Sequence, residues 1–152
     1  GLKIAWIGDG NNVCNSMIYG AALSGAKMSI ATPKGFEPDK STVKVSQNLT
    51  DIELTTDPLK AAENADVVVT DTYSSIHNND SKRIKKFIPK YQVNDKIMDL
   101  AKKNAIFLHC LPAKRDQEVT SSVIDGPQSV VWDEAENRLH TQKALLCALL
   151  HA

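Results

Sequence analysis

Short apolar runs of strand length alternate along the chain with longer segments that show a helical pattern of apolar residues. Strands are expected at residues 2–7, 28–32, 51–55, 67–70, 105–109 and 129–132. Helices are expected at residues 13–23, 58–64, 94–102 and 139–150. Strands that are apolar throughout and are separated by helices are typical of a parallel sheet with both faces covered. The pattern therefore predicts a doubly wound, Rossmann-like α/β fold with three layers, α/β/α.

Three of the expected strands end in clusters of polar residues. These are Gly-Asp-Gly-Asn-Asn at residues 8–12, Asp-Thr-Tyr-Ser-Ser at residues 71–75 and His-Cys-Leu-Pro at residues 109–112. In a doubly wound fold the carboxyl ends of the parallel strands lie at one edge of the sheet, and ligands bind outside that edge. The three clusters are therefore expected to lie together and to form the site.

The composition excludes several kinds of partner. A chain of 152 residues fits one domain, and its 18 lysine and arginine residues balance 18 aspartate and glutamate residues, so no net charge attracts nucleic acid or an anionic membrane. No apolar run reaches the roughly 20 residues needed to cross a bilayer, and the first residues lack the layout of a secretory signal. These features favour a protein of the cytoplasm or of an organelle matrix.

The three cysteines are far apart and form no Cys-x-x-Cys pair, which argues against a disulfide framework and against a structural zinc site. Cys14 and Cys147 fall in helical patterns and are predicted to be small core residues. Cys110 ends an expected strand, and it is either a further core residue or a thiol that orients or deprotonates an amine. His109 is either a satisfied core histidine or part of the same site.

The first polar cluster resembles a dinucleotide-binding turn only in part. Gly8 and Gly10 begin the glycine pattern, but Val13 stands at its third position, and no acidic residue closes the second expected strand. This argues against a nicotinamide cofactor. The helix N-terminus that follows remains suited to an anion, and Asn12 offers an amide that can bind a carboxylate. The alternative is that Asn11 and Asn12 only turn the chain and cap the helix.

Other polar positions also have two interpretations. Asp71 and Ser75, four residues apart, either bind an ammonium group or form an aspartate-led turn. Arg138 either holds a phosphate or pairs with a nearby glutamate. The basic run at residues 82–86 has no aromatic residues between its charges and is predicted to be a solvated helix or loop face beside the site.

Residues 144–150 are apolar at every position, which leaves the last expected helix without a polar face for water. This helix is expected either to be buried within the domain or to pack on a surface outside these 152 residues.

Taken together and in this order, four segments resemble the ornithine carbamoyltransferases. They are GDGNNVCNSM at residues 8–17, DTYSS at 71–75, HCLP at 109–112 and DEAENRLHT at 133–141. The resemblance covers essentially the whole chain but matches only the second of that family's two domains. It implies that residues 1–152 are the ornithine-binding domain. The family's amino-terminal carbamoyl phosphate-binding domain, with its Ser-Thr-Arg-Thr phosphate loop, has no counterpart here.

The activity that this resemblance implies is transfer of the carbamoyl group from carbamoyl phosphate to the side-chain amine of L-ornithine, which gives L-citrulline and phosphate. By analogy, Asn12 would hold the ornithine carboxylate, Asp71 and Ser75 its α-ammonium group, and Cys110 the reacting amine, with His109 beside it. The resemblance implies no metal and no redox cofactor.

For the second substrate, the resemblance implies contacts of Cys110, the Leu111 carbonyl and Arg138 with carbamoyl phosphate. The bond from Leu111 to Pro112 is cis in this family. One departure is that the family's Ser-Met-Gly loop reads Ser-Ile-His here, so that Ile76 takes the methionine's place at the ornithine site. This change bears on loop closure and on selectivity for the side chain.

Alternative functions remain open from the sequence. Putrescine carbamoyltransferases are similar around residues 109–115 and 133–139, but putrescine has neither a carboxylate nor an α-amine for Asn12 and Asp71 to bind. Aspartate carbamoyltransferases carry a proline where Cys110 stands. A non-catalytic amino-acid-binding module and a nicotinamide dehydrogenase are the alternatives from other classes. For the favoured function, we expect the isolated chain to turn over negligibly, its last helix to be exposed or rearranged, and the full enzyme to be a homotrimer.

Overall fold

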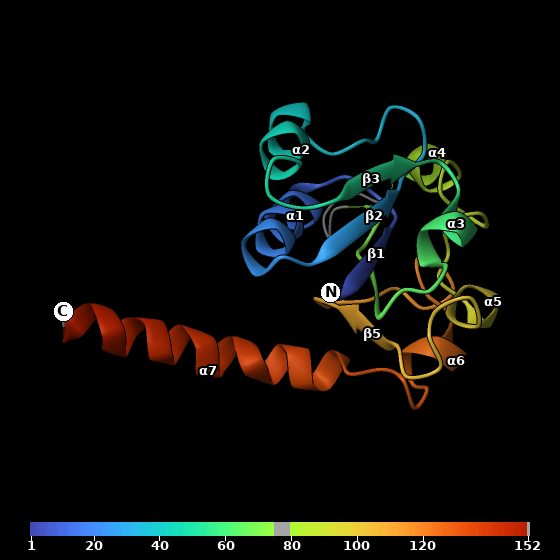
Figure 1. Cartoon of the computed structure of the whole chain (residues 1–152). Helices are drawn as coiled ribbons and strands as arrows, with labels where there is room; N and C mark the ends of the chain where they lie inside the picture. Colours follow the sequence, from blue (N-terminus) through green and yellow to red (C-terminus); the bar gives the residue numbers. More distant parts are fainter. Residues whose placement is uncertain (75–79, 152) are drawn as a thin grey trace.

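A sheet of parallel strands forms the centre of the protein (Figure 1). The structure, a computed structural model, describes residues 1–74 and 80–151. In this part of the chain the strands are β1 Lys3–Ile7, β2 Lys27–Ala31, β3 Ile52–Thr55, β4 Val67–Thr70 and β5 Ile106–His109. Their order is β3-β2-β1-β4-β5, and each neighbouring pair is parallel. The predicted doubly wound α/β fold is confirmed.

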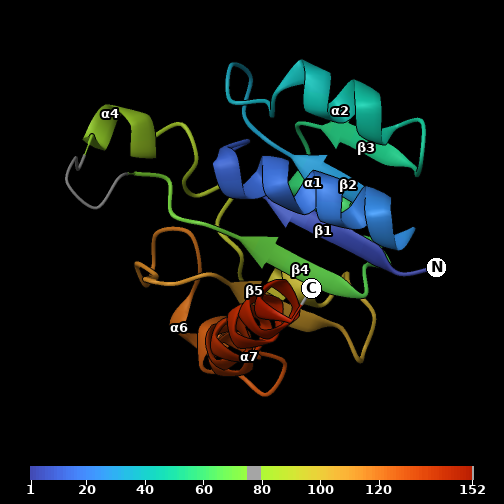
Figure 2. The same ribbon diagram turned by 90° about the vertical axis from the view of Figure 1, so that its left-hand side faces the viewer.

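Helices cover both faces of this sheet. The helices of the described chain are α1 Asn12–Ser24, α2 Lys40–Ser46, α3 Pro58–Ala62, α4 Ser81–Ile84, α5 Asp95–Met98, α6 Ser121–Ile124 and α7 Val131–Leu150, of which α7 projects away from the sheet. Helices α1 and α2 lie on one face, and α3, α5 and α6 lie on the other (Figures 1 and 2). The protein therefore has the three predicted layers.

The core consists of two hydrophobic clusters, one on each face of the sheet. In β1, Trp6 packs with Ile18 of α1, whereas Ala5 and Ile7 pack with Ala61 of α3 on the opposite face. Side chains of a strand alternate between the faces, and here both faces are covered. This double burial explains why the strands read as continuously apolar runs.

The strand order sets the position of the ligand site. From β1 the chain continues to β2 on one side, while β4 pairs with β1 on the other side. The order therefore reverses between β1 and β4, and the crevice outside the carboxyl ends of these two strands is where doubly wound folds bind ligands.

Capping residues define the helix that follows β1. The side chain of Asn11 accepts hydrogen bonds from the backbone amides of Val13 and Cys14, each at 3.0 Å, and so begins α1. Gly25 ends the helix with φ 72°, a left-handed conformation that glycine adopts without steric cost. Both ends agree with the helix that the sequence predicts.

Several predicted elements need correction. The strand expected at residues 129–132 is wrong, because only an isolated bridge joins Ser129 to Phe107, and α7 already begins at Val131. The helix expected at residues 94–102 is shorter, since α5 ends at Met98. Helix α2 was not predicted, because its valines and threonine have low helix propensity, and the Asp39 cap that begins it is a weak signal.

Helix α7 projects away from the domain, as Figure 1 shows. Within the described chain, Val131 is its one buried residue, and its leucines are about three-fifths exposed or more. The expectation of an exposed last helix is confirmed. Cys14 is buried as predicted, but Cys147 is exposed on α7, so its assignment to the core is wrong. No helix among the described residues is long and apolar enough to span a membrane.

Phe107 tests the packing of the strand that leads to the site. Its side chain is fully buried in β5, so Phe107→Ala should lower the free energy of unfolding by about 3 to 5 kcal/mol. The matched control is Leu23→Ala on α1, where the side chain is 84% exposed and the change should stay within about 0.5 kcal/mol. Urea denaturation at 25 °C measures both values, and equal effects would contradict the described core.

Candidate active site

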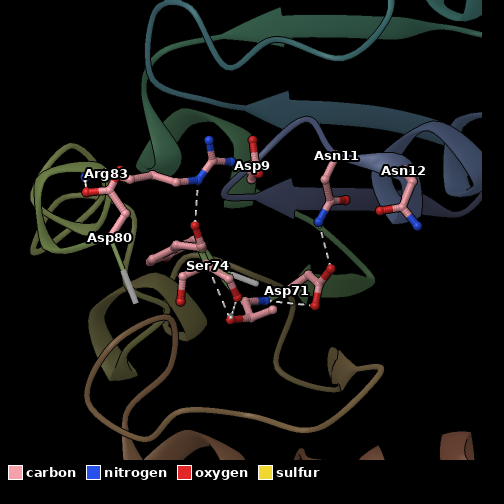
Figure 3. Close-up of a pocket in the computed structure, with 9 residues that line it drawn as sticks. Asp9, Asn11, Asn12, Asp71, Ser74, Asp80 and Arg83 are labelled. Atoms are coloured by element: carbon pink, nitrogen blue, oxygen red, sulfur yellow. Dashed lines mark hydrogen bonds and ion pairs between the residues drawn. The ribbon is translucent and has the colours of Figure 1, made fainter. Parts of the chain in front are cut away.

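A cavity of about 510 Å³ opens outside the carboxyl ends of β1 and β4 (Figure 3). Its charged lining residues are Asp9, Asp71, Asp80 and Arg83, and the amides of Asn11 and Asn12 lie on the same wall. The polar ends of β1 and β4 therefore meet in one pocket, as the sequence predicts. Three carboxylates against one guanidinium make the described lining acidic.

Asp71 connects the three turns that form the site. Its carboxylate accepts a hydrogen bond from Asn11 Nδ2 at 2.7 Å and another from Cys110 Sγ at 3.3 Å. Asp71 is only 6% exposed, and it follows the buried strand β4 directly. Because Asn11 follows β1 and Cys110 follows β5, one carboxylate ties together the ends of three strands.

The two asparagines of the first turn have different positions. Asn11 caps α1 through its side-chain oxygen and donates to Asp71 through its side-chain nitrogen. Asn12 is the first residue of α1, is exposed and lies on the cavity wall (Figure 3). The capping interpretation therefore holds for Asn11, while Asn12 is available to a ligand.

Cys110 is a protonated thiol in this environment. Desolvation, together with the negative charges of Asp71 and Glu134, raises its pKa from 9.0 to about 12. The S–H group donates to Asp71, which also favours the neutral form. Of the two roles considered for this thiol, the arrangement supports orienting an amine and not removing its proton.

His109 lies behind the pocket with its ring fully buried. Its Nε2 is 3.3 Å from Glu118 Oε1, and its Nδ1 accepts a hydrogen bond from the Leu111 amide at 2.9 Å. Nδ1 therefore carries no proton, and the proton of a neutral ring lies on Nε2. This imidazole holds the turn after β5, in which Leu111 has φ 53° and the bond from Leu111 to Pro112 is cis, as the resemblance implies.

Polar atoms of Asp71, His109 and Cys110 lie within 4.8 Å of one another, which is close enough to share a cation. However, both imidazole nitrogens of His109 already bind protein groups, so neither has a lone pair free for a metal ion. The geometry is that of a hydrogen-bond network in which each member orients the next.

Asp9 and Arg83 form an ion pair in the pocket wall that the sequence reasoning missed. Arg83 Nη2 donates to Asp9, its Nε donates to the Tyr73 carbonyl at 2.7 Å, and its guanidinium lies 4.7 Å from the ring centre of Phe36. Burial raises the pKa of Asp9, and the charge of Arg83 opposes that rise. An aspartate between two glycines at a strand end was the available signal for this site.

The basic run from Lys82 to Lys86 is thus only partly solvated. Lys82, Lys85 and Lys86 are exposed as predicted, whereas Arg83 turns to Asp9 and Ile84 is buried.

The cavity is not lined by the other predicted site residues that the structure describes, which are His109, Cys110, Leu111 and Arg138. Ser75 and Ile76 lie outside the described residues. Cys110 is joined to the cavity lining by its hydrogen bond to Asp71. Leu111 lines a separate cavity together with Pro112 and Trp132. Arg138 is exposed on α7, and in the described chain it forms no ion pair with a glutamate.

The fold and the pocket define a doubly wound α/β domain with a polar cavity at the carboxyl ends of its strands. Residues 1–149 match the sequence profile of the Asp/Orn binding domain of aspartate/ornithine carbamoyltransferases. The chain therefore belongs to the aspartate/ornithine carbamoyltransferase family.

Individual relatives agree with this family. The chain is 61% identical to an ornithine carbamoyltransferase of Cenarchaeum symbiosum, over 98% of this chain and 50% of that protein. The crystal structure of the Thermus thermophilus ornithine carbamoyltransferase is 44% identical with a TM-score of 0.88, over 99% of this chain and 48% of that one. The structure of the ornithine carbamoyltransferase from Pyrococcus furiosus matches with a TM-score of 0.91 at 46% sequence identity, over 96% of this chain and 49% of that one. The chain thus spans about half the length of the relatives it matches.

Alkylation by iodoacetamide should report the protonated state of Cys110. In a Cys147→Ser variant, which removes the exposed competing thiol, the rate should still be rising at pH 11, because at pH 9 a thiol of pKa about 12 is ionised in only about one molecule in a thousand. Adding Asp71→Asn removes a nearby negative charge and should shift the profile to lower pH. A midpoint at or below pH 9 in the parent variant would contradict this description.

Loss of the Asp9–Arg83 pair should destabilise the pocket wall. Arg83→Met leaves a largely buried carboxylate without its partner and should lower the free energy of unfolding by about 2 kcal/mol. Lys82→Met, on the same helix but exposed, should change it by less than about 0.5 kcal/mol. Thermal and urea unfolding of the two variants provide the comparison, and indistinguishable curves would show that the pair has no such role.

Proposed function

We propose that this chain is the ornithine-binding half of an ornithine carbamoyltransferase. The whole enzyme transfers the carbamoyl group of carbamoyl phosphate to the side-chain amine of L-ornithine and releases L-citrulline and phosphate. The observation that carries this proposal is the Asp71 carboxylate, which joins the turn of Asn11 and Asn12 to Cys110 at the mouth of an acidic pocket.

The charges of the pocket match those of ornithine. Ornithine has two amino groups and one carboxylate, so near neutral pH it carries a net positive charge. The acidic lining attracts such a ligand, and Asp71 can pair with its α-ammonium group. Asn12 lies on the same wall, where its amide can bind the carboxylate, and we assign Ser75 and Ile76 to ornithine as well.

The reaction needs an unprotonated amine next to the carbamoyl carbon. A free amine of this kind has a pKa of about 10.4, so transfer to a partly desolvated site favours loss of its proton. The nitrogen lone pair then attacks the carbonyl carbon, the bond from that carbon to the phosphate oxygen breaks, and the nitrogen gives up its remaining extra proton.

In this scheme the residues of the chain orient the reactants. The neutral Cys110 thiol, which is held by Asp71, positions the attacking nitrogen, and the buried His109 holds the turn from which the Leu111 carbonyl contacts the carbamoyl NH₂. Arg138 binds the phosphate that leaves. Much of the rate comes from holding the two reactants together and from stabilising the charge that develops on the phosphate.

The proposal includes the parts of the enzyme that this chain does not contain. A second half of similar length supplies the rest of the carbamoyl phosphate site, which agrees with relatives about twice as long as this chain. We further propose a cytoplasmic homotrimer that acts in arginine metabolism.

Calorimetric titration of the chain with ornithine and with putrescine tests the ligand assignment. Ornithine should bind at least about tenfold more tightly, because only ornithine uses Asp71 for an α-ammonium group, a charge-assisted hydrogen bond. Asp71→Asn should weaken ornithine binding about tenfold or more.

The matched control is Asp99→Asn, which changes an exposed aspartate and should leave the affinity within about twofold. Equal binding of the two amines, or equal effects of the two substitutions, would contradict an ornithine site.

A further inference from the structure

The first turns of α7 are joined to the turn that carries Cys110. Glu134 Oε2 accepts a hydrogen bond from the His109 backbone amide at 2.9 Å. The His109 amide belongs to the residue that ends β5 and precedes Cys110. Glu134 was not among the residues that the sequence assigned to the site.

The start of α7 is fixed at the same strand. The Val130 amide donates to the Phe107 carbonyl at 3.1 Å, and the Phe107 amide donates to the Gln128 carbonyl at 2.8 Å. Val131, the first residue of the helix, is fully buried. These contacts determine where the helix begins, and Figure 1 shows it leaving the domain beside β5.

Beyond its first turns, α7 is not packed against the rest of the described chain. Its residues from 135 to 150 are exposed, so contacts near its start must set its direction and its rotation about its own axis. Val131 and Glu134 are three residues apart and therefore face the same side, towards β5. Among the described residues, this bond to His109 is thus the last side-chain hydrogen bond between α7 and the domain before Arg138.

Arg138 is one helical turn further on. It is four residues after Glu134 and therefore lies on the same face, about 6 Å along the axis. If the register of α7 against β5 changed by one residue, Arg138 would turn by about 100° about the helix axis, away from the turn at Cys110.

We propose that Glu134 is a positioning residue that fixes α7 against the end of β5 and thereby directs Arg138 to the carbamoyl phosphate site. This inference rests on the proposed function, because it needs Arg138 to bind the phosphate. Glu134 itself touches neither substrate. It fixes the orientation of Arg138 and of the Cys110 turn relative to each other.

Steady-state kinetics of the whole enzyme that includes this chain test the proposal. Glu134→Ala should raise the KM for carbamoyl phosphate about tenfold, which is the loss expected for one charge-assisted hydrogen bond, while the KM for ornithine stays within about twofold. Glu134→Gln retains a side-chain oxygen that can accept the hydrogen bond from the His109 amide. Its KM for carbamoyl phosphate should therefore stay within about twofold of the wild-type value. Glu136→Ala is the matched control, because Glu136 is exposed and, among the described residues, pairs with His140 of the same helix alone.

A double variant separates positioning from general damage to the fold. If Glu134 acts through Arg138, then Glu134→Ala combined with Arg138→Gln should bind carbamoyl phosphate no more weakly than Arg138→Gln alone, within about twofold. Hydrogen exchange of the His109 amide should be faster in Glu134→Ala and unchanged in Glu134→Gln and in the Glu136→Ala control.

Two results would overturn the proposal while leaving the proposed function intact. One is a KM for carbamoyl phosphate in Glu134→Ala that equals the wild-type value. The other is a double variant in which the effects of Glu134→Ala and Arg138→Gln on carbamoyl phosphate binding add in full. A wild-type whole enzyme that forms no citrulline would instead overturn the proposed function, and this inference would fail with it.

Discussion

The site depends on one buried carboxylate. Asp71 follows strand β4, which lies between β1 and β5, and accepts hydrogen bonds from Asn11 after β1 and from Cys110 after β5. A carboxylate that is almost fully buried must be compensated by such donors, because an unpaired charge in the interior is costly. The need to satisfy Asp71 thus holds the turns after β1, β4 and β5 in one arrangement.

This constraint explains the chemical state of the thiol. Burial and two nearby carboxylates raise the pKa of Cys110, and its S–H group donates a hydrogen bond to one of these carboxylates. The thiol is therefore neutral at physiological pH. A thiol of this kind orients a partner without competing for its proton. Behind it, the buried pair of His109 and Glu118 fixes the turn through the Leu111 amide. The residues that surround the reacting group therefore serve mainly to position it.

Much of this arrangement could be predicted from the sequence. The continuously apolar strands β1, β2, β4 and β5 specify a doubly covered parallel sheet, and the polar residues that follow them specify one edge. The sequence places Asn12, Asp71 and Cys110 at this edge, and the structure brings the turns that carry them together there. The first helix was clear because an asparagine begins it and a glycine ends it.

Other features depend on tertiary contacts that leave no local pattern. The valines at 130 and 131 read as a strand, yet a single bridge to Phe107 fixes them at the start of a helix. Arg83 reads as one charge in a basic run, and only the fold brings it to Asp9, 74 residues earlier in the chain. Cys147 reads as a core residue because its neighbours in α7 are apolar, yet the described part of the chain leaves it exposed.

The most direct test of the account is the set of backbone amide resonances that shift when ornithine is added to the ¹⁵N-labelled chain. If Asp71 organises the binding site, the largest shifts should fall together at residues 9–12, 71–74 and 109–111. Shifts confined to one of these turns, or centred elsewhere on the domain, would contradict it.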